Sequence, residues 1–131
     1  MPRSAIMLKR FLPLVFAPLL LAGCSTTFTN LTPLTQVRNT NNLYTVEVAF
    51  TTRQQSLRWD SIQPKILAHG ETYPMRPTPL MTNRWEGLLP VPAGTSEVNY
   101  RYKFDFSDNA FGGPVSDSAL SKDYTLRILE P

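Results

Sequence analysis

The chain has 131 residues, with 13 basic and 10 acidic side chains and a formal net charge of +3. Three of the basic residues, Arg3, Lys9 and Arg10, lie in the first 23 positions and no acidic residue does, so the rest carries ten of each sign. That balance leaves no retained basic patch of the kind that nucleic-acid binding requires. The remaining length is enough for one small domain with a modest core.

The N-terminus has the layout of a secretory signal. The three cations precede an apolar run from Phe11 to Ala22 that contains Pro13 and Pro18. This run is about a dozen residues long, whereas a membrane-spanning helix needs roughly 20. We therefore predict that residues 1–23 are a cleavable signal peptide and not a permanent membrane helix.

Cys24, the one cysteine of the chain, closes this run in the stretch Leu21-Ala22-Gly23-Cys24. A branched apolar residue, two small residues and a cysteine resemble the lipobox of bacterial lipoproteins. The resemblance implies a diacylglyceryl group on the Cys24 thiol, cleavage before Cys24, and membrane anchoring through several acyl chains. Because Ser25 stands where aspartate retains enterobacterial lipoproteins in the inner membrane, it also implies the periplasmic face of the outer membrane. The alternative is an ordinary buried cysteine.

The segment after Cys24 is rich in Ser, Thr and Asn and has no sustained periodicity. We interpret residues 24–42 as a lipidated N-terminus and a flexible polar tether, which would span something over ~20 Å. The alternative is that this segment docks onto the domain as an edge strand through Phe28, Leu31, Leu34 and Val37.

After Asn42 the apolar residues recur at every second position, which is typical of half-buried strands. The clearest run, from Val98 to Phe106, places its aromatic residues on one face and polar residues on the other. Asp108-Asn109 and Gly112-Gly113-Pro114 indicate that Ser107 to Ser118 is a loop. The expected strands are Tyr44–Phe50, Ile62–Ala68 with a return through Thr72–Met75, Asn83–Leu89, Val98–Phe106 and Tyr124–Ile128.

These patterns predict one all-β domain over residues 43–131. About seven short strands separated by turn signals favour an antiparallel immunoglobulin-like β-sandwich, here without the usual disulfide. No stretch has helical periodicity.

Three stretches of the second half resemble the immunoglobulin-like modules that bind starch and glycogen or precede the catalytic domain in glycogen-debranching enzymes: Trp85 to Gly94, Tyr100 to Phe104, and Gly113 to Val115. The resemblance covers under half of the chain, and the first half lacks the aromatic, asparagine-containing turn of those modules. It implies the same fold. Among the positions that such modules use for sugar contact, only Lys103 is matched in this sequence.

The residue types for catalysis are sparse. His69 is the one histidine, it sits beside Gly70 in an expected turn, and no second histidine or free thiol accompanies it. A zinc site or a Ser-His-Asp triad would need partners for this histidine, and the chain has no Gly-x-Ser-x-Gly elbow. We therefore predict no catalytic residues, no metal, no cofactor and no enzymatic activity.

The most promising binding residues are aromatic or lie near prolines. We expect Trp85 to be largely buried and Trp59 to be at least half exposed, and the spaced prolines of Tyr73 to Leu80 to hold an extended conformation. The predicted contact surface contains Trp59 and the loop from Tyr73 to Leu80, with Tyr73 and Arg76 as its most promising residues. The predicted function is a membrane-anchored protein-interaction or assembly module, and the alternative is a carbohydrate- or peptidoglycan-binding module.

Overall fold

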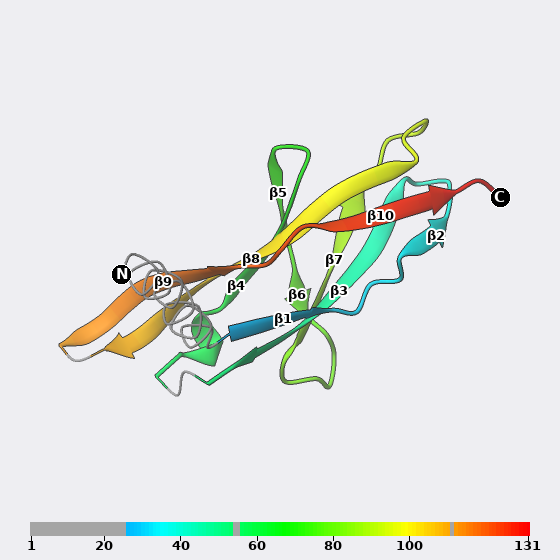
Figure 1. Cartoon of the computed structure of the whole chain (residues 1–131). Helices are drawn as coiled ribbons and strands as arrows, with labels where there is room; N and C mark the ends of the chain where they lie inside the picture. Colours follow the sequence, from blue (N-terminus) through cyan, green and yellow to red (C-terminus); the bar gives the residue numbers. More distant parts are fainter. Residues whose placement is uncertain (1–25, 54–55, 111) are drawn as a thin grey trace, which may run out of the picture.

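A computed structural model describes residues 26–53, 56–110 and 112–131, which form two packed β-sheets (Figure 1). The first sheet has the strand order β1-β3-β7-β6; the second has the order β2-β10-β8-β4-β5, with β9 also paired to β8. The elements are β1 Thr26–Asn30, β2 Thr35–Val37, β3 Leu43–Thr52, η1 Trp59–Ser61, β4 Gln63–Ala68, β5 Glu71–Pro74, β6 Arg76–Pro77, β7 Arg84–Pro90, β8 Glu97–Ala110, β9 Gly113–Leu120 and β10 Tyr124–Leu129. The prediction of an all-β sandwich is confirmed.

The alternating sequence pattern creates the core between the sheets. In β3 the side chains of Tyr44, Val46, Val48 and Phe50 are all buried, and the residues between them face outward. The matching face of β8 runs from Val98 to Phe106 and is buried as the pattern predicts. Phe104 lies at the centre, because its ring centroid is 5.0 Å from those of Phe50 and Trp85 and 5.1 Å from that of Phe28.

The segment predicted to be a flexible tether is part of the sandwich, so that prediction is wrong for residues 26–37. β1 pairs antiparallel with β3, from Thr26 opposite Thr52 to Asn30 opposite Val48, and β2 pairs parallel with β10. The alternative of edge-strand docking is correct in part: the segment forms two edge strands, one on each sheet, but Leu34 and Val37 are exposed. Phe28 supplies the anchoring contact, since it packs against the core between Phe50 and Phe104.

A network of polar side chains fixes the crossover from β1 to β2. The Tyr102 hydroxyl donates to Asn30 Oδ1 at 2.7 Å and lies 3.2 Å from the Thr32 hydroxyl. Asn30 Nδ2 donates to the Tyr100 hydroxyl at 2.9 Å, and the Glu47 backbone N–H donates to the Thr32 hydroxyl at 2.9 Å. Burial raises the pKa of Tyr102 far above its ordinary value. These bonds satisfy polar groups that would otherwise be costly to bury.

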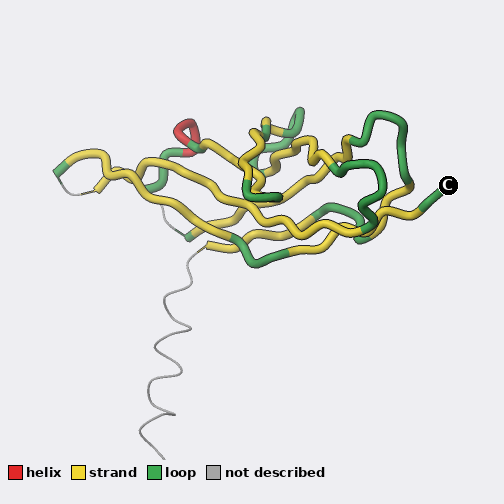
Figure 2. Tube along the Cα trace, turned by 90° about the horizontal axis from the view of Figure 1, so that it is seen from above, coloured by secondary structure: helices red, strands yellow, loops and turns green. Residues whose placement is uncertain are grey.

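The stretch from Ser107 to Ser118, predicted to be a loop, is a β-hairpin instead. β8 and β9 pair from Lys103 opposite Leu120 to Ala110 opposite Gly113. Gly112 and Gly113 have φ angles of 102° and 129°, which glycine adopts without strain, so the turn signals mark only the tip. Figure 2 shows this hairpin projecting at one end of the sandwich, beyond η1.

The predicted signal peptide and Cys24 lie outside the described residues. Within the described ranges, no helix is both long enough and apolar enough to cross a bilayer.

Candidate functional site

Trp59 lies in η1 against the edge of the core. Its ring stacks on Trp85 with centroids 6.2 Å apart and an interplanar angle of 5°, and it meets Phe50 edge-on at 6.1 Å. Trp85 is buried as predicted, whereas Trp59 is 44% exposed, slightly less than the predicted half. Trp59 is therefore supported on one face by aromatic rings and open to solvent on the other.

A shallow depression lies beside Trp59. Its volume is about 530 Å³, and its walls are the end of β3 and the residues that lead into β7: Phe50, Thr51, Thr52, Thr82 and Asn83. Phe50 N–H donates to the Asn83 carbonyl at 3.0 Å, which ties these two segments together.

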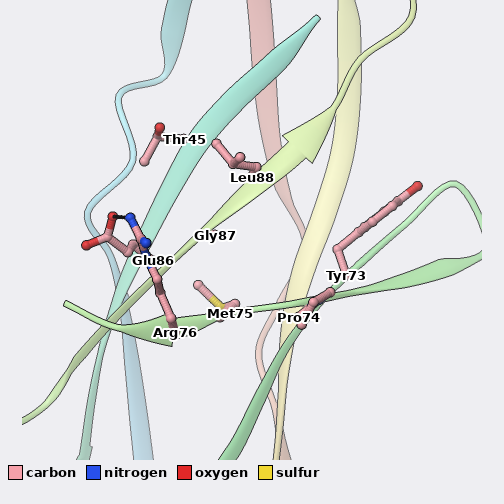
Figure 3. A pocket seen from close by; sticks show the side chains of 8 residues that line it. All are labelled: Thr45, Tyr73, Pro74, Met75, Arg76, Glu86, Gly87 and Leu88. Carbon is pink, nitrogen blue, oxygen red and sulfur yellow. Dashed lines mark hydrogen bonds and ion pairs between the residues drawn. The ribbon is translucent and has the colours of Figure 1, made fainter.

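A second hollow, a groove of about 500 Å³, lies at the edge of the sandwich, between β5 of the second sheet and β7 of the first (Figure 3). Tyr73, Pro74, Met75 and Arg76 line it where the chain passes from β5 in the second sheet to β6 in the first. The opposite wall consists of Thr45 from β3 and Glu86, Gly87 and Leu88 from β7.

Gly87 permits this crossing. A Cβ at this position would lie 2.9 Å from Ile66 Cδ1, 3.1 Å from the Pro74 carbonyl oxygen and 3.2 Å from Met75 Cγ. Two of these atoms belong to the crossing segment, so a side chain at residue 87 would push Pro74 and Met75 outward. The close approach of β5 and β6 to β7 thus depends on glycine.

The edge of β7 is open where it borders the groove. On this side β6 pairs only with Trp85 and Glu86, and no other strand within the described ranges pairs with β7 there. Two contacts show which backbone groups of β7 face this edge. Thr78 N–H donates to the Arg84 carbonyl, and His69 Nε2 lies 3.0 Å from the Pro90 carbonyl. The even-numbered residues of β7 therefore direct their backbone N–H and C=O groups toward the open edge. Leu88 is one of these even-numbered residues, so its backbone groups also face the open edge, and its side chain is 51% exposed.

The structure divides the predicted binding residues among three places. Tyr73 and Arg76 share the groove, where the Tyr73 hydroxyl donates to Glu71 at 3.2 Å and Arg76 pairs with Glu86 at 3.5 Å. Partial burial raises the pKa of Tyr73. Trp59 lies in the separate depression. Lys103 lies on the outer face of the second sheet, 3.9 Å from Asp105.

The proline-rich stretch is extended as predicted from Tyr73 to Pro77, where two short strands change sheets, but it turns after Thr78, and Leu80 has a φ of 66°. Sequence reasoning included Met75 within the predicted contact stretch but missed Gly87 and Leu88. Leu88 carried a usable signal, because it is an apolar residue on the outward face of a predicted strand.

The described residues contain no group of three or more His, Cys, Asp or Glu side chains arranged to hold a metal ion. His69 is exposed in the β4–β5 turn with a φ of 56°, as expected for a surface turn residue. Trp59 is the one aromatic residue of the described ranges that is exposed, so they present no row of rings for stacking on sugars.

No protein-family model matches the chain, and no curated protein matches it. Two solved structures are similar in shape. One is a DUF4785 family protein from Legionella pneumophila, with a TM-score of 0.43 and 10% identity; the match covers 77% of this chain but only 28% of that protein. The other is AggA, the major subunit of aggregative adherence fimbriae type I from Escherichia coli, with a TM-score of 0.41 and 11% identity over 81% of this chain and 94% of that one.

Proposed function

We propose that the chain is a non-enzymatic lipoprotein of the bacterial envelope whose sandwich binds another envelope protein. The lipobox resemblance supports cleavage before Cys24, acylation of its thiol, and a position on the periplasmic face of the outer membrane. Lipid anchoring raises the effective concentration of a binding module near partners on the same membrane. A modest interface is then sufficient.

The observation that carries the binding role is the open edge of β7 at Leu88, next to the groove. An unpaired strand edge offers backbone donors and acceptors to an incoming extended segment. Met75 and the exposed Leu88 side chain provide an apolar wall beside that edge. The partner is therefore a protein that supplies an extended segment with an apolar side chain to the groove.

Affinity capture from solubilised membranes tests this role. Leu88→Arg should abolish capture of the partner, because it places a charge against the groove wall. Leu120→Arg is the matched control, since Leu120 is 52% exposed against 51% for Leu88 and lies in β9, away from the groove. Full capture by a folded Leu88→Arg variant would refute the site. Turnover of a glycan or peptide by the purified protein would refute the non-enzymatic role.

Metabolic labelling with a palmitate analogue tests the anchor separately. The wild-type chain should incorporate the label and fractionate with membranes, and the Cys24→Ser variant should do neither. Unchanged labelling of Cys24→Ser would refute the lipoprotein proposal.

A further inference from the structure

The start of β1 leaves almost no chain between the proposed lipid and the folded domain. Thr26 is already paired with Thr52, and only Ser25 separates it from Cys24. Extended chain spans at most ~3.3–3.6 Å per residue, so the two steps from Cys24 to Thr26 reach no more than about 7 Å. If Cys24 carries the lipid, this corner of the sandwich is held at the bilayer surface.

The same corner carries exposed apolar side chains. Asn83 bonds to Phe50, and Thr82 and Asn83 line the same depression as Thr51 and Thr52, so the loop from Thr78 to Asn83 lies beside the end of β3. This loop exposes Leu80 completely and Met81 by 39%. Figure 1 shows the end of β3 and the β6–β7 loop both pointing to the lower side of the view.

Trp59 joins these two residues at the corner. The depression beside its ring is lined by Thr51 and Thr52 on one side and by Thr82 and Asn83 on the other. Tryptophan favours the bilayer–water interface, where its ring is apolar and its N–H remains solvated. Arg53 is also exposed here and suits anionic headgroups.

We infer that the sandwich docks onto the lipid bilayer through this corner, with Trp59, Leu80 and Met81 entering the headgroup region. The inference rests on the proposed acylation of Cys24. Trp59 reaches this corner from η1, which is joined to β8 because Arg58 N–H donates to the Ser107 carbonyl, whereas the β8–β9 hairpin projects beyond η1. The hairpin exposes the polar residues Ser116, Asp117 and Ser118 together with Val115 and Leu120, and it is not part of the proposed contact.

Quenching of tryptophan fluorescence tests the docking. The acylated full-length protein is reconstituted into vesicles of dibrominated phosphatidylcholine and phosphatidylglycerol, and vesicle flotation is measured in the same samples. Because Trp85 is buried and Trp59 is exposed, the bromine atoms should quench the fluorescence of Trp59. At an insertion depth of ~5–10 Å we expect the Trp59 emission to fall about two-fold. Trp59→Phe should remove the quenched component.

Paired leucine variants locate the contact. Leu80→Asp should reduce the quenching, whereas Leu34→Asp should leave it unchanged, because Leu34 is 77% exposed but precedes β2, at the opposite end of β1. Circular dichroism confirms that each variant is folded. Protein that floats with vesicles without quenching of Trp59 overturns the docking and leaves the anchor intact. Protein that does not float overturns the anchor, and the docking with it.

Discussion

The two halves of β8 differ in what stabilises them. From Val98 to Phe106 alternate side chains are buried between the sheets, and β10, β4 and the end of β9 pair with this half of the strand. From Ser107 onward the strand is paired mainly with β9, whose residues are exposed except for the half-buried Ala119. Backbone pairing continues along the whole strand, whereas burial stops part of the way. We therefore expect the first half to determine stability and the second to contribute little.

The largest expected effect is at Phe104, in the buried half. Phe104→Ala removes a ring that contacts Phe28, Phe50 and Trp85, and it should reduce the free energy of unfolding by about 3–5 kcal/mol. Chemical denaturation measures this change. A loss below about 1 kcal/mol would show that the aromatic cluster is not the stabilising core.

A smaller loss is expected where the buried half meets the β1–β2 crossover. Asn30→Ala removes the side-chain donor to the Tyr100 hydroxyl and the shortest of the hydrogen bonds of the Tyr102 hydroxyl, and it should cost about 1–3 kcal/mol. Asn99→Ala is the control, because its exposed side chain accepts one bond from Thr125, and it should change stability by no more than about 0.5 kcal/mol. Equal losses for the two variants would contradict the role of the network.

Alkaline pH should lower the free energy of unfolding through Tyr102, which belongs to the same network. Because burial raises the pKa of Tyr102, the unfolded chain loses this proton near pH 10 while the folded chain retains it. Its contribution to stability is therefore complete below pH 10 and falls above it by about 1.4 kcal/mol per pH unit. Denaturation measured between pH 9 and about pH 11.5 should show a shallower fall for Tyr102→Phe. An unchanged slope would contradict this assignment.

The smallest effect is expected in the projecting half. Val115 is 51% exposed on β9, so Val115→Thr should change the free energy of unfolding by no more than about 0.5 kcal/mol. Thermal unfolding of the two proteins side by side measures it. A loss above 1 kcal/mol would mean that the hairpin belongs to the cooperative core.

The same contrast explains what the sequence could predict. Alternation of apolar and polar residues indicates a strand with one buried face. The sequence therefore predicts the strands Tyr44 to Phe50 and Val98 to Phe106 and the burial of Trp85 correctly. The β9 strand has no buried face, and its residues resemble loop residues. Likewise, β1 contains three threonines and only one residue that packs against the core, Phe28, so it has no apolar periodicity. Strands held mainly by backbone pairing leave little trace in the pattern of apolar residues.

The candidate groove was only partly predictable for a related reason. Tyr73 and Arg76 stood out because they lie in a proline-rich stretch, and they do line the groove. The opposite wall depends on Gly87, where the crossing segment comes close, and on the open edge at Leu88. Both follow from which strands become neighbours, and single-sequence periodicity does not contain that information.

The parallel pairing of β2 with β10 joins the beginning of the domain to its last strand. Gln36 lies opposite Ile128, and Arg38 holds Glu130 at 3.0 Å, so these contacts close a loop of about ninety residues. Closing such long loops slows folding. During synthesis the sandwich therefore stays incomplete until its final residues emerge, because β8 and β10 supply much of the core. Before β10 is made, β2 lacks its pairing partner and the core lacks Leu126 and Ile128.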